Sequence, residues 1–367
     1  MKIDFANLQL QYRKYKDEID KNIQKVLDKS NYIMGEEIAL LEEKLSDFCG
    51  AEYAIGCGSG TDALLLALLA IDIKPEDEVI TTPFTFIATA ETIALLGAKP
   101  VFVDIREDSY NIDASLIEEK ITDRTKAIIP VSLYGQPCDM DEINAIASKY
   151  NLTVIEDAAQ SFGAYYKNKR SCNLSKIGCT SFFPAKPLGC YGDGGAVFTS
   201  DEDLALKIKQ LRVHGQDRRY HHKYIGMGAR LDTIQAAVLL AKLPHYEEEI
   251  KLREKVALKY SEKLKDTHVI TPKIKNDRNS VWAQYSIRVK NRDVLQKYLK
   301  EKGIPTAVHY PMPLHMQECF SYLNYKEGDF PISEKISKEI MSLPMNPFLT
   351  DEEIEYIVDS IKSFEEV

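Results

Sequence analysis

Short apolar runs alternate with amphipathic stretches over about the first 240 residues of the chain. The apolar runs are rich in valine and isoleucine and end in polar or turn residues, which is typical of buried strands. The stretches between them carry apolar side chains at helical spacing. Strands separated by such helices indicate a parallel or mixed sheet with helices on both faces. The predicted strands are 51–58, 76–83, 99–105, 126–135 and 152–159, and the predicted helices are 16–28, 35–48, 85–96, 113–121 and 139–150.

The pattern changes near residue 245, where a long charged helical stretch (244–265) is not followed by a buried strand. We therefore predict a large α/β domain at 1–245 and a smaller α+β domain, with its linking helix, at 246–367. Thr350 and Glu353 have the spacing of a capping box at the start of the last helix. In the smaller domain we expect strands at 281–289 and 304–310 and helices at 291–303 and 349–364.

Composition narrows the class of protein. The 367 residues are 44% apolar and 28% charged, as in an ordinary soluble enzyme, and the net charge of −9 argues against nucleic acid or an anionic membrane as the main partner. Seven scattered cysteines without C-x-x-C pairing predict reduced thiols, with neither a disulfide framework nor a metal site. No run approaches the roughly 18 apolar residues of a membrane span, and the first residues lack the apolar run of a signal peptide. We therefore expect a cytoplasmic protein.

Candidate chemistry begins at a glycine-rich turn, GCGSGT at 56–61, where the first predicted strand leads into an apolar helix. Free backbone N–H groups and the positive end of a helix suit a phosphate, and Ser59 or Thr61 could add a hydroxyl donor. Taken alone, the turn is equally consistent with close packing of small residues. It does not fit the G-x-G-x-x-G dinucleotide fingerprint, because position 61 is threonine.

Two further candidate residues, Asp157 and Lys186, lie later in the chain. Asp157 lies near the carboxyl end of the predicted strand 152–159, where it could bind a metal, join an ion pair, hold the ring nitrogen of a cofactor or cap a helix. No histidine, cysteine or aspartate cluster stands beside it at ligand spacing, which disfavours the metal. Lys186 lies in the apolar stretch SFFPAKPLG, and such surroundings lower the pKa of lysine and favour the neutral amine that forms Schiff bases. Ser181 is a second candidate phosphate donor. A phosphate turn, a carboxylate at a strand end and a buried lysine together meet the needs of pyridoxal 5'-phosphate (PLP).

The segments CGSGTDALLLAL, TTPFTFIATAE, VIEDAAQSFGA, SFFPAKPLGCYGDGGAVFT and RLDTIQAAVLLAKL, in this order, resemble the DegT/StrS family of PLP-dependent sugar aminotransferases. The likeness runs over essentially the whole chain. It implies the aspartate aminotransferase-like (type I PLP) fold, PLP as cofactor and a homodimer with shared active sites. By matching motifs, it implies Lys186 as the Schiff-base lysine, Asp157 on the pyridinium nitrogen, Gln160 on the phenolic oxygen, Phe86 stacked on the ring, and Gly60, Thr61 and Ser181 at the phosphate.

One position departs from the family pattern. The family usually has G-x-N-x-R before the helix RLDTIQAA, and its asparagine reaches the phosphate site of the neighbouring subunit. This chain has Gly228 at the asparagine's place. The resemblance therefore implies that this contact is lost, or supplied by backbone or water, while the chemistry at Lys186 is unaffected.

The segment 212–230 is locally basic in an acidic protein, which suits an anionic ligand such as a nucleotide diphosphate, although a solvated charged loop is the plainer interpretation. It most resembles family members that aminate UDP-2-acetamido-2-deoxy-3-oxo-glucuronate. This implies such a UDP-keto sugar as substrate, glutamate as donor, and a role in surface polysaccharide or glycan biosynthesis. A 4-keto-6-deoxy sugar nucleotide is the alternative. The candidate substrate contacts are Arg212, His214, Arg230, His309 and Tyr310.

Three other functions agree less well with these residues. A related PLP-dependent sugar dehydratase would typically have histidine in place of Lys186. A dinucleotide-dependent oxidoreductase would explain the glycine-rich turn but leave Lys186 and Asp157 without roles. A regulator on the same fold would need a DNA-binding module or a missing lysine. In the expected reaction glutamate displaces Lys186, and the freed amine acts as the general base for a 1,3-proton shift.

Overall fold

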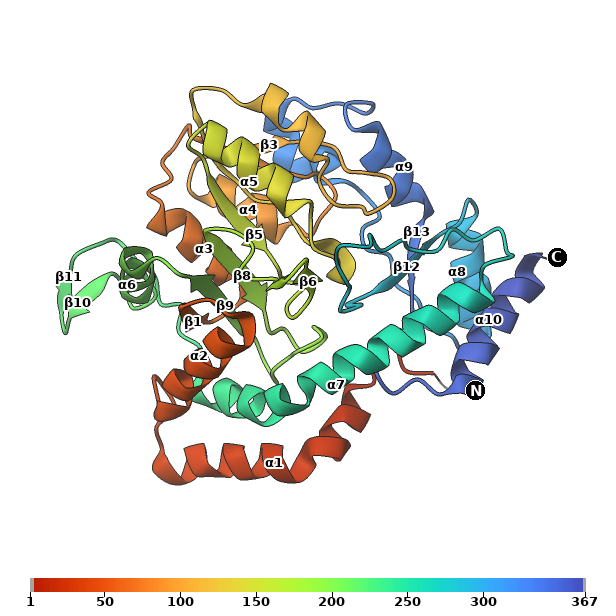
Figure 1. Ribbon diagram of the computed structural model, residues 1–367, viewed down its shortest axis with the longest axis horizontal. Helices are drawn as coiled ribbons and strands as arrows, with labels where there is room; N and C mark the ends of the chain where they lie inside the picture. The colour runs from red at the N-terminus through yellow and green to blue at the C-terminus, as the bar shows by residue number, and fades with distance from the viewer. Residues whose placement is uncertain (1–2, 366–367) are drawn as a thin grey trace.

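A mixed seven-stranded sheet lies at the centre of the larger part of the molecule, in a computed structural model that describes residues 3–365 (Figure 1). The strand order is β1-β9-β8-β5-β4-β2-β3. Strand β9 runs antiparallel to its neighbours β1 and β8, and the other pairs are parallel. The strands are β1 (Tyr53–Cys57), β2 (Glu78–Thr81), β3 (Lys99–Phe102), β4 (Thr125–Ile128), β5 (Thr153–Asp157), β8 (Ile177–Ser181) and β9 (Gly195–Thr199).

Helices cover both faces of this sheet. One face carries α3 (Gly60–Ala70), α4 (Ala88–Leu95) and α6 (Glu202–Leu211), and the other carries α2 (Glu36–Cys49), α5 (Met140–Lys149) and the first half of α7 (Thr233–Lys263). Successive residues of a strand point to opposite faces. Accordingly, Ile55 packs with the first group of helices and Ala54 with the second, and Val79 and Ile80 divide in the same way. The outermost helix, α1 (Leu8–Lys29), lies along α7 (Figure 1).

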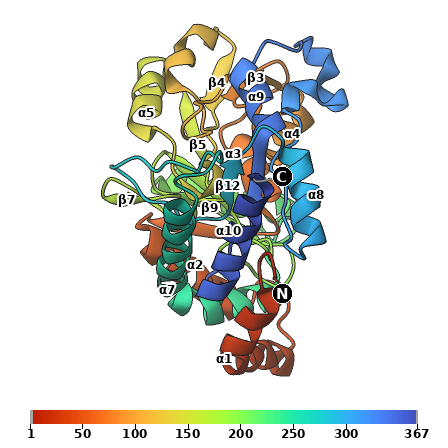
Figure 2. The same ribbon diagram turned by 90° about the vertical axis from the view of Figure 1, so that its right-hand side faces the viewer.

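A second core forms around the far half of α7, which extends from beneath the sheet to the C-terminal elements (Figures 1 and 2). Besides Val256 and Tyr260 of α7, it contains residues between 269 and 304 and residues between 341 and 361. The predicted division near residue 245 falls inside α7 and stays a prediction. The elements that follow are β12 (Tyr285–Arg288), α8 (Arg292–Glu301), α9 (Pro331–Glu339), β13 (Ile340–Leu343) and α10 (Asp351–Glu365).

Two predicted elements are wrong. Residues 304–310 do not form a strand; only Ala307 makes a bridge, to Ser342, and Pro305 has no N–H for a longer ladder. The expected helix at 113–121 consists of two short 3₁₀ turns, Ala114–Leu116 and Glu118–Lys120. A helix of so few residues gains little, because its first turn is costly to nucleate.

The capping box at the last helix is confirmed. The backbone N–H of Thr350 donates to Glu353 Oε2 at 2.9 Å, and the N–H of Glu353 donates to Thr350 Oγ1 at 3.2 Å. Two small hairpins were not predicted. They are β6 (Tyr165–Tyr166) with β7 (Lys169–Arg170), and β10 (Gln216–Arg218) with β11 (His221–His222), which projects from the body in Figure 1.

Candidate active site

Asp157 ends β5 at the carboxyl edge of the sheet, and its side chain is held by two donors. Thr89 Oγ1 in α4 donates to Oδ2 at 2.8 Å, and the backbone N–H of Ala159 donates to Oδ1 at 3.1 Å. Burial raises the pKa of Asp157, whereas the two hydrogen bonds and the positive charge of Lys186 act in the opposite direction. The result is an oriented carboxylate, 5% exposed, that faces a cationic partner.

Lys186 lies in the loop after β8, where its backbone N–H donates to the carbonyl of Phe183 at 2.8 Å. Phe182 is fully buried beneath this loop and Phe183 is half exposed at its surface. Burial lowers the pKa of Lys186, in the direction that its apolar surroundings predicted, and the charge of Asp157 partly opposes the shift. A lowered pKa increases the fraction of neutral amine available as a nucleophile or base.

The glycine-rich turn meets the end of β8. Helix α3 begins at Gly60, and Ser59 caps it by accepting a hydrogen bond from the N–H of Asp62 at 2.9 Å. A Cβ atom at Gly60 would lie only 2.7 Å from the Cβ of Ser181, so the absence of a side chain at residue 60 permits this close approach. The Ser59 oxygen accepts the cap bond and still has its O–H to donate, so Ser59, Thr61 and Ser181 are all candidate hydroxyl donors to a phosphate.

Gln160 connects two tyrosines on another side of the site. Its Oε1 accepts from the backbone N–H of Tyr134 at 2.8 Å, and its Nε2 donates to the hydroxyl of Tyr310 at 3.2 Å. The ring of Phe86, 54% exposed, lies 6.3 Å from the ring of Tyr310. These aromatic and amide groups lie near Asp157, and the pKa of Tyr310 is raised first by burial and second by the charge of Asp157.

His309 is neutral at physiological pH, because burial and the nearby charge of Lys186 lower its pKa to about 4. Its Nδ1 lies 2.9 Å from Ser342 Oγ, and its carbonyl accepts a hydrogen bond from the hydroxyl of Tyr134. The imidazole is thus a neutral polar group beside Lys186, contributed by a segment more than a hundred residues further along the chain.

The three basic candidates for substrate contacts have different environments. Arg212 is 4% exposed, and its Nη1 binds Glu42 and the carbonyl of Gly56, which argues against it as a substrate contact. His214 is exposed, and its ring lies 3.1 Å from the position that a Cβ of Gly228 would take. Arg230 is partly exposed, with Nη2 3.9 Å from the same position. The space above Gly228 is therefore flanked by His214 and Arg230.

Sequence reasoning missed two residues that orient the site, Thr89 and Tyr134. Thr89 lies in the segment that follows β2, and Tyr134 lies in the segment that follows β4. Both segments leave the carboxyl ends of central strands, and that rule had drawn attention to Asp157. Extending the rule to every central strand would have singled out both residues, but not which atoms they contact.

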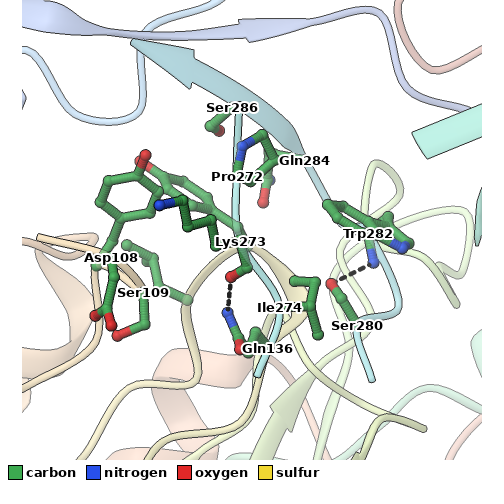
Figure 3. A pocket seen from close by; sticks show the side chains of 13 residues that line it. Asp108, Ser109, Gln136, Pro272, Lys273, Ile274, Ser280, Trp282, Gln284 and Ser286 are labelled. Atoms are coloured by element: carbon green, nitrogen blue, oxygen red, sulfur yellow. Dashed lines mark hydrogen bonds between the residues drawn. The ribbon is translucent and has the colours of Figure 1, made fainter. Parts of the chain in front are cut away.

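A small cavity is lined in part by Tyr134, and Figure 3 shows the side chains around it. Its volume of about 20 Å³ suits a single water rather than a sugar nucleotide. Two atoms of its lining residues, Ser109 Oγ and Gln284 Oε1, are buried without a hydrogen-bond partner. Within residues 3–365 no cluster of three histidine, cysteine or acidic side chains is arranged to hold a metal. In the same residues no helix is both long and apolar enough to cross a membrane.

The fold and the site together define a PLP-dependent enzyme of the aspartate aminotransferase type. A buried carboxylate, a lysine of lowered pKa and a helix N-terminus lie at one edge of a mixed sheet, and these are the kinds of group that PLP requires. The chain belongs to the DegT/DnrJ/EryC1/StrS aminotransferase family, whose sequence profile matches residues 13–362. The family and the fold predicted from the motifs are thereby confirmed.

Known relatives are similar over nearly their full length. The chain is 56% identical over 355 residues to UDP-2-acetamido-2-deoxy-3-oxo-D-glucuronate aminotransferase of Pseudomonas aeruginosa, covering 97% of this chain and 98% of that protein. The structure of DesV from Streptomyces venezuelae with a ketimine intermediate matches with a TM-score of 0.98 at 36% identity, covering 100% of this chain and 99% of the other. NtdA of Bacillus subtilis, solved with bound cofactor PMP, matches with a TM-score of 0.92 at 30% identity, covering 100% and 86%.

Proposed function

We propose that this aminotransferase uses PLP to transfer an amino group from glutamate to a UDP-linked keto sugar, UDP-2-acetamido-2-deoxy-3-oxo-glucuronate. The observation that carries the proposal is the convergence of Asp157, Lys186 and the turn at Gly60 on one edge of the sheet. The 56% identity to an enzyme named for this substrate supports the sugar. A place in surface polysaccharide or glycan biosynthesis follows from such a substrate.

The residues fit the cofactor part by part. Asp157 would hold the protonated ring nitrogen, Gln160 the phenolic oxygen, and Thr61 and Ser181 the phosphate at the start of α3. Phe86, largely exposed in the single chain, offers a flat surface for the ring. When bound, PLP supplies an electron sink for the bond cleavage that transamination requires.

Lys186 moves the proton in this proposal. Its amine would hold the cofactor at rest and, in its free form, would act as the general base that takes a proton from one carbon and returns it at another. The lowered pKa leaves more of the amine neutral for that step. Because His309 is neutral beside Lys186, it does not compete for the proton at physiological pH and can bond a sugar hydroxyl.

The substrate would be held by exposed basic and polar groups. His214 and Arg230 flank the space above Gly228, and the hairpin β10–β11 carries further cations, Arg218 and Arg219. A nucleotide diphosphate and a sugar carboxylate are the anions that such groups bind. Arg212 is omitted from this set, because its guanidinium is already paired within the protein.

We also propose that two copies share their active sites. Large apolar side chains are exposed at the turn before α2, in the segment after β2 and in the Lys186 loop. Exposing these side chains to water is unfavourable unless a partner covers them. They include Tyr32, Ile33, Met34, Phe86 and Phe183. We place the dimer in the cytoplasm, and we retain the division into domains 1–245 and 246–367 as a proposal.

The substrate is tested by mass spectrometry of the sugar nucleotide after incubation with enzyme, PLP and glutamate. The matched pair is UDP-2-acetamido-2-deoxy-3-oxo-glucuronate and a UDP-linked 4-keto-6-deoxy sugar. We expect amination of the uronate, seen as replacement of the keto oxygen by an amine. Amination of the 4-keto sugar alone would overturn the substrate and keep the reaction type, and amination of neither, with PLP bound, would overturn both.

A further inference from the structure

The loop that follows Lys186 is attached to helix α7 at two points. The chain turns sharply after the lysine, and the N–H of Cys190 donates to the carbonyl of Phe182 at 2.8 Å. Beyond this turn, Gly189 and Tyr191 each bond a side chain of α7. The loop is therefore fixed by a helix from another part of the chain, in addition to its own backbone bonds.

The first attachment is Lys242, a lysine buried to 3% exposure in the middle of α7. Its ammonium donates to the carbonyl of Gly189, three residues after Lys186, and lies 5.3 Å from the centre of the Tyr191 ring. Burial lowers the pKa of Lys242 to about 8, while the charge of Glu249 raises it. Lys242 is thus protonated at neutral pH and donates a charge-assisted hydrogen bond.

The second attachment is Gln235, whose Oε1 accepts from the backbone N–H of Tyr191 at 2.8 Å. A Cβ on Gly192 would lie 2.8 Å from Gln235 Nε2, so the chain passes directly over this amide. Gln235 and Lys242 are seven residues apart, about two turns of an α-helix, and therefore lie on one stripe of α7. One stripe of the helix thus contacts both ends of the segment 189–192.

We propose that Lys242 and Gln235 are positioning residues that fix the Lys186 loop, and with it the side-chain amine of Lys186, relative to Asp157. A lysine buried without an ion pair is unfavourable for stability alone, since an apolar side chain of similar length would avoid its desolvation. A role in aligning the reactive amine of Lys186 accounts for the presence of a buried lysine at position 242 of α7. This inference rests on the proposed function, because it assumes that Lys186 carries the chemistry.

The test compares Lys242→Met and Lys242→Arg in the full-length enzyme loaded with PLP. The visible absorption of the bound cofactor, titrated with pH, reports the environment of Lys186 independently of turnover. We expect Lys242→Met to shift the pH midpoint of that absorption and to lower kcat by about 10- to 100-fold, because small displacements of a reacting group are costly. KM should change little, and Lys242→Arg should restore most of both signals.

Lys251→Met removes an exposed lysine from the same helix and serves as the matched control. Gln235→Leu should act in the same direction as Lys242→Met with a smaller effect, and it provides the test if Lys242→Met fails to fold. A lowered melting temperature with unchanged absorption midpoint and kcat would overturn the inference and leave a structural role. A wild-type protein that shows no PLP absorption would instead overturn the proposed function.

Discussion

The turn at 56–61 and the hairpin β10–β11 are both candidate anion sites, but they are built in opposite ways. The turn uses backbone N–H groups at the start of α3, and the N–H of Gly58 is itself fixed by the carbonyl of Ala229 at 3.0 Å. The hairpin uses side-chain cations in solvent, among them Arg218 and Arg219. The turn is packed against Ser181, whereas the hairpin projects from the body (Figure 1).

This difference in construction corresponds to two kinds of ligand, one that is the same in every catalytic cycle and one that differs between related enzymes. A preorganised backbone site suits a group that is the same in every catalytic cycle, such as a cofactor phosphate. Exposed side chains on a hairpin can change without disturbing the core, and they suit a substrate that differs between relatives. We expect changes near the turn to affect chemistry or stability, and changes on the hairpin to affect substrate affinity.

The largest effect on turnover is expected for Lys186→Ala, which changes the site beside the turn at 56–61. Turnover should fall by about 1,000-fold or more, since both the covalent attachment and the general base are lost. PLP should still bind without covalent attachment through the turn, as measured by its retention after gel filtration. Lys169→Ala, which removes an exposed lysine elsewhere, should retain wild-type turnover. Near-normal turnover of Lys186→Ala would refute the assignment of the reactive lysine.

Arg212→Ala tests whether Arg212 stabilises the turn or binds substrate with the basic segment. By sequence Arg212 belongs to the basic segment, but its Nη1 binds the carbonyl of Gly56 at the edge of the turn. Because the carboxylate of Glu42 would lose its cationic partner, we expect a loss of about 3–5 kcal/mol in the free energy of unfolding. Urea unfolding measures this loss, with Arg218→Ala as control. Unchanged unfolding with a raised KM would restore Arg212 as a substrate contact.

The smallest effect is expected on the hairpin. The double variant Arg218→Ala/Arg219→Ala should raise KM for the UDP-sugar by about 10-fold, and less at high salt, because exposed charges are screened. Its kcat, PLP content and unfolding free energy should remain close to wild type. Steady-state kinetics at two ionic strengths give the result. A salt-independent KM equal to that of the wild type would remove the hairpin from substrate recognition.

Much of the fold could be predicted because its signals are local. Buried strands and amphipathic helices are marked by side-chain patterns that repeat every few residues, and Asp157 lies at the end of a strand that this pattern predicts. Lys186 is singled out by its apolar neighbours, since no strand is predicted immediately before it. What the sequence did not show depends on contacts between distant residues. The pairing of Arg212 with Glu42 and the bridge that replaces the expected strand at 304–310 both join segments far apart in the chain. Spacing along the sequence carries no information about such contacts.

The same limit applies to the candidate site. The motif resemblance predicted roles for Gln160 and Phe86, and these roles stay predictions. It gave no indication that Thr89 donates to Asp157 or that Tyr134 bonds both Gln160 and His309. These contacts join elements whose relative placement depends on the packing of the whole sheet.

The pairing of β1 also bears on how the protein is made. This strand is at the edge of the seven-stranded sheet and its neighbour in that sheet is β9, where residues 53–57 meet residues 195–199. The turn after it is further fixed by a bridge from Cys57 to Arg230. Such contacts have high contact order, which slows folding. During synthesis the turn at 56–61 therefore cannot form its native contacts until some 140 to 170 later residues have been translated. In that period β1 has no strand to pair with, and its backbone is exposed to chaperones or to aggregation.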